Sequence, residues 1–462
     1  MAKKGLIKRL FAPTDMTVGS PWKSIAIFTL PMLVGNIAQQ LYSTVDSIVV
    51  GQEIGDNALA AVGSAAPVLN MLLALFIGIS AGTNIMVSQY FGAKNREGLS
   101  YSIGNSITVT AAACLLLIAV ASPLIRPALV LLKTPPSIID WCAEYLMVCL
   151  VGMAGMAYYN ILSGVLRGLG DSISALIYLL VATVLNIGLD IFFVKVVGMG
   201  VGGVAVATVI SQFVSSALCL IKLSRMRDCF DFGLRFLKPK KQYVKTIIRL
   251  GIPSGLTQAI FSSAMIIVQS LTNCFGEQFI AANVVTMRVD GFAMMPNFSF
   301  GTALTTYAGQ NVGAGLYDRV TKGAKQGTLM AVGCSATITG VILIFGKNLM
   351  RVFSETDELV EMSYYLMTIL AVGYIAVAVT QSLSGIMRGA GDTMTPMWIS
   401  LITTVAIRVP IAYGISYLTR TAELPYGRSE CIQISLLSSW VIGAILTAIF
   451  YAAGRWKKKA IQ

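Results

Sequence analysis

Apolar stretches of about 20 residues recur along the whole chain, separated by short polar segments that are rich in glycine, proline and charge. A helix needs about 20 apolar residues to cross roughly 30 Å of hydrocarbon, so each stretch predicts one membrane-spanning helix. Twelve stretches occur, six in each half of the chain. They lie near residues 24–50, 58–88, 101–122, 141–166, 172–197, 200–223, 245–273, 280–310, 322–346, 360–388, 393–419 and 430–453.

One sequence motif occurs twice, which indicates an internal duplication. Ser163–Ser172 reads SGVLRGLGDS, and Ser384–Thr393, 221 positions later, reads SGIMRGAGDT. A period this long indicates two copies of a whole domain. Glycine in each motif suits a tight turn, and the aspartates, Asp171 and Asp392, are expected to cap the helices that follow.

The even number of spans in each copy predicts how the copies are related. Six crossings return the chain to the same side, so both copies enter the membrane in the same orientation. The sequence therefore predicts an all-α polytopic membrane protein with twelve transmembrane helices, arranged as two parallel six-helix repeats about a pseudo-twofold axis along the membrane normal, with a central cleft. The predicted domains are an N-lobe at 1–223, a cytoplasmic basic linker at 224–244 and a C-lobe at 245–462.

Composition and charge agree with a membrane protein. Hydrophobic residues make up 56% of the chain and charged residues only 12%. Most Lys and Arg residues fall in loops on one side, above all in Lys222–Arg249, which predicts cytoplasmic N- and C-termini in the cell (inner) membrane. This topology accounts for the net charge of +13 without a nucleic-acid partner. The eight cysteines form no C-x-x-C pair and histidine is absent, so neither a metal nor a disulfide is indicated.

Three aspartates lie inside predicted spans and are functional candidates. Asp46, Asp190 and Asp290 would each cost about 2.5–3.5 kcal/mol at the centre of a membrane helix. None has an acidic twin at the repeat offset. A desolvated aspartate readily takes up a proton, and a pair of aspartates with amide oxygens can instead hold Na⁺. Because protonation would remove the attraction for an organic cation, the ion and the cation could compete for these groups, as antiport requires.

Other polar residues recur at helical spacing around these acids and predict a cavity lining. The alternative is a purely structural role, in which these residues form hydrogen bonds between helices. Arg288 could neutralise a carboxylate on a neighbouring helix or serve structure alone, and these alternatives stay open. The candidate lining residues are Asn36, Gln39, Gln40, Ser43, Thr183, Asn186, Gln258, Gln269, Asn283, Met287, Arg288, Met294, Tyr374 and Gln381.

The chain resembles the multidrug and toxic compound extrusion (MATE) family, and in particular its bacterial DinF-like and MepA-like branch. The resemblance runs nearly from end to end. It is carried by QLYSTVDSIVVG at 40–51, LNIGLD at 185–190, QYFGA at 89–93, RVDGFAMMP at 288–296, QNVGAG at 310–315 and both RGxGD motifs.

This resemblance implies two six-helix lobes around a V-shaped cavity and the export of amphipathic, often cationic, compounds in exchange for H⁺ or Na⁺. Asp290 resembles an acidic C-lobe position of the branch, and Pro31 resembles a proline around which the first helix bends. The positions that resemble the ion site of the N-lobe are Asp46, Asn186, Asp190 and Thr208, and Tyr145 is a candidate residue of the substrate cavity beside them.

The coupling ion and the cargo each have an alternative. The NorM-like branch has an acid in the seventh helix, where this chain has only Gln258 and Gln269. We therefore expect H⁺ coupling, with Na⁺ bound by Asp46, Asn186 and Asp190 as the alternative. A lipid-linked oligosaccharide flippase is the rival function, but its anionic cargo would favour arginine and lysine in the cavity. An enzyme or a cofactor is not expected, because no nucleophile–base motif occurs. The expected state is a monomer in the lipid bilayer.

Overall fold

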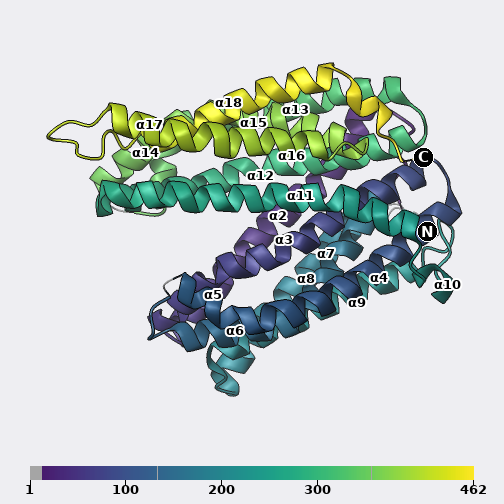
Figure 1. Cartoon of the computed structure of the whole chain (residues 1–462), viewed down its shortest axis with the longest axis horizontal. Helices are drawn as coiled ribbons and strands as arrows, with labels where there is room; N and C mark the ends of the chain where they lie inside the picture. Colours follow the sequence, from purple (N-terminus) through teal and green to yellow (C-terminus); the bar gives the residue numbers. More distant parts are fainter. Residues whose placement is uncertain (1–12, 133, 355, 462) are drawn as a thin grey trace, which may run out of the picture. The chain divides into compact units, whose positions relative to one another are not determined.

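The computed structural model describes residues 13–132, 134–354 and 356–461, without the side chains of Ser43, Ser47 and Asp56. These residues form helices and connections, and no strand occurs among them (Figure 1). Within this part of the chain, nine single helices and two bent helix pairs are long and apolar enough to cross a membrane. The predicted all-α polytopic fold is confirmed.

Each of the twelve predicted spans corresponds to a helix or to two consecutive helices. The short helix α5 (Ile125–Leu131) continues α4 through a 3-10 turn at Ser122–Leu124, and α10 (Leu234–Leu237) lies in the connection between α9 and α11. The spans are α2 (Pro21–Glu53), α3 (Asp56–Gly92), α4 (Arg96–Ala121), α6 with α7 (Ile139–Val151 and Met153–Gly168), α8 (Ser172–Ile191), α9 (Gly200–Ser224), α11 (Lys241–Thr272), α12 (Glu277–Gly313), α13 (Tyr317–Arg351), α14 with α15 (Asp357–Ala371 and Gly373–Gly389), α16 with α17 (Met394–Leu401 and Arg408–Leu418) and α18 (Cys431–Ala452).

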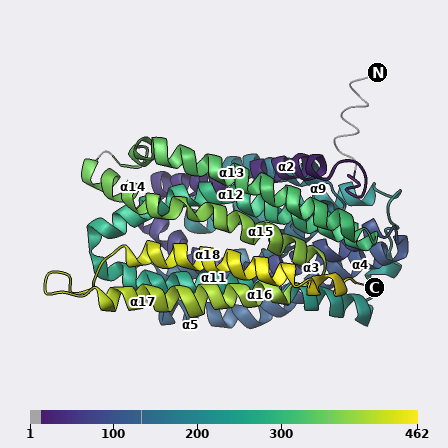
Figure 2. The same ribbon diagram turned by 90° about the horizontal axis from the view of Figure 1, so that it is seen from above.

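Helix α12 is long enough to cross a membrane but is not among the helices that are apolar enough on composition alone. It contains Arg288 and Asp290 and many hydroxyl and amide side chains. Most of its residues from Ala293 onward are buried against neighbouring helices. Figure 2 shows α12 beside α13 and α15, with which it packs. Burial against neighbouring helices therefore accommodates many of the polar side chains that make α12 less apolar than a lipid-facing helix.

Two predicted spans differ from single straight helices. The span predicted at 141–166 bends by 51° between α6 and α7, and the span predicted at 360–388 bends by 44° between α14 and α15. Gly152 lies at the first break, where a side chain would collide with Val209. Gly373 begins α15 after the second break, and a Cβ atom there would lie 2.5 Å from the ring of Trp440. Close packing at glycine thus accompanies both bends.

The chain forms two compact units whose boundaries cut through two helices. Unit 1 contains Leu30–Leu256 and the described residues before Met16, whereas unit 2 contains Met16–Thr29 and the chain from Thr257. The first turns of α2 thus belong to unit 2, and the first turns of α11 belong to unit 1. The lobes predicted from the sequence, 1–223 and 245–462, stay a prediction. The contacts of the structure place the start of α2 in unit 2 and the start of α11 in unit 1, which differs from the predicted lobe boundaries.

The first turns of α11 pack unusually closely on α3 within unit 1. A Cβ atom on Gly78 would lie 2.6 Å from the carbonyl oxygen of Gly251, and one on Gly82 would lie 2.9 Å from the backbone nitrogen of Gly251. Gly255 meets the carbonyl oxygen of Ala74 in the same way, at 3.0 Å. Small residues spaced four apart let two membrane helices approach until their backbones touch. This contact explains why residues 241–256 group with unit 1.

The duplicated motif has the same structural role in both units. Gly170 and Gly391 have φ angles of 84° and 96°, which favour glycine and allow the tight turn. Asp171 then accepts a hydrogen bond from the backbone nitrogen of Ser174 at 2.9 Å. Asp392 accepts the equivalent bond from Thr395 at 3.2 Å. Both aspartates cap the following helix, as predicted.

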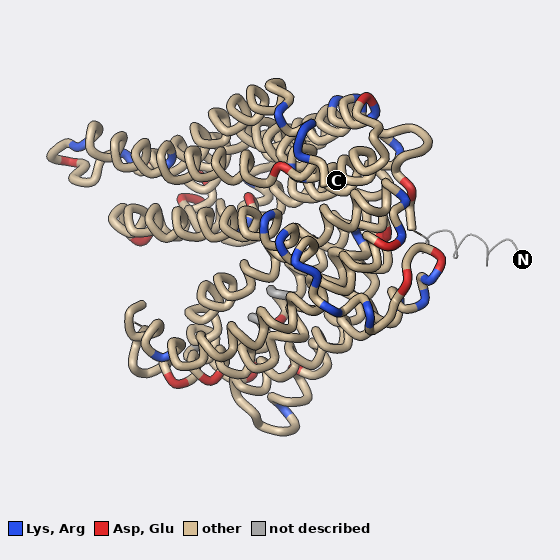
Figure 3. Tube along the Cα trace, turned by 45° about the vertical axis from the view of Figure 1, so that its right-hand side comes forward, with Lys and Arg blue, Asp and Glu red and all other residues tan. Residues whose placement is uncertain are grey.

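Charged residues lie mainly in connections and at helix ends, while the middles of most helices carry none (Figure 3). The basic connection between α9 and α11 is fixed to unit 1 through its backbone. Asn105 on α4 donates to the carbonyl oxygen of Phe236 at 3.2 Å and accepts from the backbone nitrogen of Lys240 at 2.7 Å. Arg96 forms an ion pair of 2.8 Å with Asp231. The linker is therefore an ordered part of the fold.

Candidate functional site

Two aspartates predicted as functional lie together in unit 1. Asp46 comes from α2 and Asp190 from the last turn of α8, directly before a π-helical turn at Phe192–Val196. Their carboxyl groups lie within hydrogen-bonding and electrostatic range of each other. Asp190 is fully buried and Asp46 is half-buried. Two carboxyl groups in contact cannot both be ionised without repulsion, so the pair needs a shared proton or a bound cation.

Amide and hydroxyl groups surround the carboxyl pair. Asn186 lies one turn before Asp190 and is buried. In the amide orientation that satisfies both of its atoms, its nitrogen donates to Oδ2 of Asp190 at 3.0 Å and its oxygen accepts from the backbone nitrogen of Thr208 at 3.2 Å. The hydroxyl groups of Tyr42 and Thr208 lie 3.3 Å apart. Tyr145 on α6 is buried and within electrostatic range of Asp46.

The carboxyl pair keeps two oxygens that can receive a ligand. Oδ1 of Asp46 and Oδ1 of Asp190 are buried and accept no hydrogen bond from the described residues. Neither aspartate takes part in an ion pair within the described chain. Unpaired carboxyl oxygens beside an amide and hydroxyl groups are suitable for a proton or for Na⁺, which prefers oxygen ligands. The geometry thus permits either ion at one place.

Tyr42 was not predicted from the sequence, although it lies one turn before Asp46 on α2. Of the other residues predicted along α2, Asn36 and Gln40 are half-buried and Gln39 is exposed, while the side chain of Ser43 lies outside the described part. Thr183 donates to the carbonyl oxygen of Leu179 on its own helix at 2.9 Å. Pro31 lies inside α2, which continues through it as one helix. Pro31 is the second residue of unit 1 in this helix, because the boundary between the units lies between Thr29 and Leu30.

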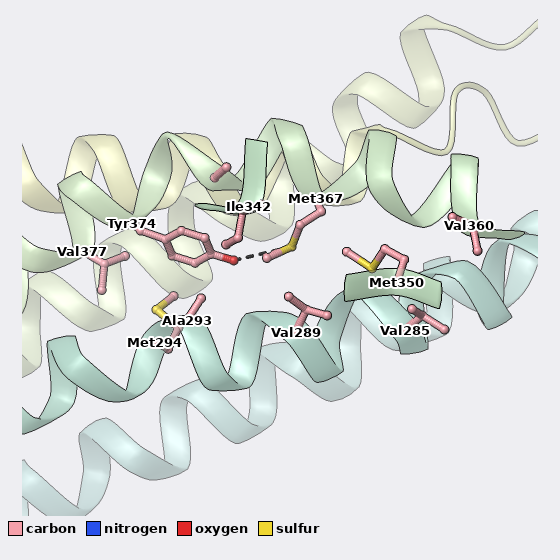
Figure 4. Close-up of a cluster of buried hydrophobic side chains, with 11 residues drawn as sticks. Val285, Val289, Ala293, Met294, Ile342, Met350, Val360, Met367, Tyr374 and Val377 are labelled. Carbon is pink, nitrogen blue, oxygen red and sulfur yellow. Dashed lines mark hydrogen bonds between the residues drawn. The ribbon is translucent and has the colours of Figure 1, made fainter. Parts of the chain in front are cut away.

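Unit 2 holds the third aspartate beside a tyrosine. The hydroxyl of Tyr374 on α15 donates to Oδ1 of Asp290 on α12 at 2.9 Å, and it also lies 3.6 Å from Sδ of Met367. Figure 4 shows the Tyr374 hydroxyl pointing toward Met367 within an apolar cluster that includes Met294. The ring of Trp440 lies 5.7 Å from that of Tyr374. Of the predicted residues, Tyr374 thus contacts the acid directly, and Met294 belongs to the same apolar cluster as Tyr374.

An arginine that the prediction did not include among site residues faces this acid. Arg408 begins α17 directly after a π-helical turn at Ile402–Ile407. It is buried, lies within electrostatic range of Asp290 and donates to Sδ of Met265 at 3.6 Å. Arg288, in contrast, is exposed and forms no ion pair among the described residues. The presence of an arginine within an apolar span was the signal that could have identified Arg408.

The remaining predicted residues of unit 2 are spread over several contacts. Asn283 accepts a hydrogen bond from Gln433 on α18 at 2.9 Å, so it has a role in joining helices. Gln269 donates to Asn273 one turn further on at 2.8 Å. Gln258 and Gln269 are exposed on α11. Met287 and Gln381 are half-buried, and Gln381 lies against Gly301.

Comparison with known proteins gives the same family in sequence and in structure. A family model described as MatE matches residues 31–192 and again residues 253–414. The chain is 29% identical to the probable multidrug resistance protein YoeA of Bacillus subtilis, with 96% of each protein covered. It is 26% identical to the probable multidrug resistance protein NorM of Thermotoga maritima, covering 95% of this chain and 94% of that protein.

A solved structure shares the fold. The crystal structure described as MATE in the bent conformation gives a TM-score of 0.88 at 24% identity, covering 96% of this chain and 98% of that one. The two matches of the family model fall on the two copies of the duplicated sequence. Together with the apolar helices, these likenesses indicate an integral membrane protein with the fold of the MATE structure.

Proposed function

We propose, because this chain belongs to the MatE family, that it is a secondary active multidrug antiporter that exports amphipathic organic cations in exchange for protons. The observation that carries the proposal is the close pair of Asp46 and Asp190, whose Oδ1 atoms are buried without a hydrogen-bond partner among the described residues. Relatives named as multidrug resistance proteins support the cargo class, and the buried acids support the coupling.

The mechanism follows from competition for negative charge. With one shared proton the carboxyl pair carries a single negative charge, which attracts a cation. A second proton makes the pair neutral and removes that attraction. By linkage, binding of the organic cation lowers the affinity for the second proton by the same factor. A proton gradient directed inward can then drive the cation outward, because the pH difference fills the site with protons from the outer side and empties it on the inner side. The membrane potential adds about 2.3 kcal/mol per 100 mV for each net charge moved inward, so it contributes only when more than one proton enters per monovalent cation exported.

Protons are preferred to Na⁺ as the coupling ion in this proposal. Two carboxyl groups within hydrogen-bonding range favour a shared proton, because a proton held between them removes their mutual repulsion. The alternative Na⁺ site would use oxygens of Asp46, Asp190, Asn186 and Thr208. No group of three or more acidic, cysteine or histidine side chains that could hold a metal ion occurs among the described residues. Two acids with neutral ligands suit a weakly bound monovalent ion better than a resident divalent metal.

Alternating access completes the proposal. The two units would rock against each other, with α2 and α11 shared between them. Pro31 lies where α2 passes from one unit to the other, and proline removes a backbone hydrogen bond, so a bend can form there. The basic linker before α11 and the basic residues Lys457–Lys459 support cytoplasmic termini in the inner membrane. We propose that the transporter acts as a monomer.

The flippase alternative is less well supported by the charges near the sites. An anionic pyrophosphate cargo would need several cations where it binds. The carboxyl pair of unit 1 has no ion-pair partner within the described chain, and unit 2 places one acid near one arginine, Arg408. Cation export therefore fits these sites better.

Counterflow in proteoliposomes with an imposed pH or Na⁺ gradient tests the proposal. We expect the parent protein to accumulate an organic cation against a pH gradient, and Asp46→Asn and Asp190→Asn to lose this accumulation. Asp140→Asn serves as the matched control, because Asp140 is exposed and pairs with Arg126 on the surface. Equal accumulation by all variants would contradict the site, and accumulation that follows only a Na⁺ gradient would contradict proton coupling.

A further inference from the structure

The guanidinium group of Arg408 is buried in unit 2 without a full set of acceptors. The residue is 5% exposed, and its Nε atom has no hydrogen-bond partner among the described residues. Its Nη2 atom lies 3.6 Å from Sδ of Met265, and a thioether is a weak acceptor. An arginine keeps its charge in proteins and has five N–H donors, and burying such donors unsatisfied is costly. Arg408 is therefore suited to receive oxygen acceptors from a ligand.

Asp290 is the acid within electrostatic range, but it does not neutralise Arg408 by direct contact. The ion pairs of the described residues do not include Arg408. Oδ1 of Asp290 accepts from the hydroxyl of Tyr374 at 2.9 Å instead. A positive and a negative group thus lie near each other while each keeps the capacity to bind a group of opposite charge.

Tyr374, which binds Asp290, belongs to an apolar and adaptable cluster, and Arg408 lies against a methionine. The rings of Tyr374 and Trp440 lie 5.7 Å apart, and Met294 and Met367 belong to the same buried cluster. Met265, which covers Arg408, is 49% exposed. A methionine side chain has three rotatable bonds and moves easily, so Met265 can swing away from the guanidinium. Flat aromatic bodies pack well on thioether and aromatic surfaces.

We infer that Arg408 and Asp290 form a binding site for an amphipathic zwitterion, in which the guanidinium binds the ligand's carboxylate and the aspartate binds its cationic group. Arginine suits this role because its planar donors bind a carboxylate through two parallel hydrogen bonds. The inference rests on the proposed export function, because it names a class of substrate for unit 2. It also separates two roles: the acid pair of unit 1 holds the coupling ion, and the mixed pair of unit 2 selects the cargo.

Two dyes that differ in one charge test this site. Rhodamine B carries a carboxylate and a cationic xanthene, and its ethyl ester keeps the cation alone. Their binding to the purified protein is measured by fluorescence polarisation for the parent, Arg408→Gln and Arg408→Lys. We expect Arg408→Gln to weaken binding of rhodamine B about tenfold or more relative to the ester, the loss typical of a charge-assisted hydrogen bond. Arg408→Lys restores part of this difference because it keeps the charge without the planar donors.

The matched control is Arg420→Gln, which removes an exposed arginine from the connection after α17. It should keep the parent ratio of the two affinities. Size-exclusion chromatography checks that each variant is folded. The inference is overturned if Arg408→Gln weakens the binding of both dyes by the same factor, or if Arg420→Gln changes the ratio of the two affinities as much as Arg408→Gln does. Export of the ester under a pH gradient is measured separately on the parent protein. If the ester is not exported while the ratio of the two dye affinities changes as expected, the antiport function is overturned and the binding site stands.

Discussion

Gly385 of α15 lies so close to Gly301 of α12 that a Cβ atom on Gly385 would collide with the carbonyl oxygen of Gly301. The equivalent contact in unit 1 joins Gly164 of α7 to Ser80 of α3, where the added atom would lie 2.5 Å from the serine hydroxyl. The duplicated motif therefore fixes one helix contact in each unit. In unit 2 this contact holds α15, which carries Tyr374, against α12, which carries Asp290.

Substituting Gly385 by alanine should destabilise unit 2, because the clash is with backbone and cannot be relieved by a side-chain rotation. We expect a loss of about 1–3 kcal/mol in the free energy of unfolding, the usual cost of overpacking. The measurement is thermal unfolding of the purified protein in detergent. Gly333→Ala on α13 is the control, because nothing lies within 4 Å of an added Cβ atom there. A loss of stability that is no larger for Gly385→Ala than for Gly333→Ala would contradict the contact.

Arg319 should hold the segment before α2 against unit 2. It donates to the carbonyl oxygens of Val18 at 2.8 Å and Gly19 at 2.7 Å, and to that of Met16 at 3.1 Å. We expect Arg319→Gln to speed hydrogen exchange at residues 16–20 by tenfold or more, since a lost charged hydrogen bond costs about 1.5–3 kcal/mol. Lys322→Gln, an exposed cation on the same helix, should leave this exchange unchanged. Equal exchange in the two variants would show that Arg319 does not restrain the segment.

The ion pair between Arg96 and Asp231 should make stability depend on pH in the acid range. Hydrogen bonding to the Arg96 guanidinium lowers the pKa of the Asp231 carboxyl. The folded state therefore gains stability above the unfolded pKa of about 3.9 and loses it as the pH falls through the lower folded pKa. We expect Asp231→Asn to lower the unfolding temperature near neutral pH and to match the parent at the acid end. Salt should reduce the difference because both groups are exposed.

A series of unfolding temperatures at falling pH measures this effect, with Asp228→Asn as the control. Asp228 lies three residues away and takes part in no ion pair among the described residues. A difference between Asp231→Asn and the parent that persists unchanged below the folded pKa would contradict the assignment of stability to this ion pair.

The twelve spans and the helix caps could be predicted from the sequence because they depend on local properties. Length and apolarity identify a membrane helix without knowledge of its neighbours. The turn at Gly170 and the cap at Asp171 follow from the chemistry of these two residue types. The same reasoning succeeded for Gly391 and Asp392.

The contacts between distant elements could not be predicted in the same way. Two arginines, Arg288 and Arg408, lie in spans, and the sequence alone does not show which one faces Asp290. Arg288 is two residues from Asp290 on the same helix, so it points to a different face and a direct pair is not expected. The structure places Arg408, far along the chain, near the acid, because the packing of α17 on its neighbours decides it. The division of α2 and α11 between the units depends in the same way on close backbone packing.

The measurement that tests the central claim most directly is proton release on substrate binding. Purified protein in weakly buffered detergent is mixed with an organic cation, and a pH-sensitive dye records the protons released. Competition at Asp46 and Asp190 predicts that the parent releases protons on binding and that Asp190→Asn releases few or none. Full binding of the cation by the parent without any proton release, in the presence and absence of Na⁺, would contradict the account.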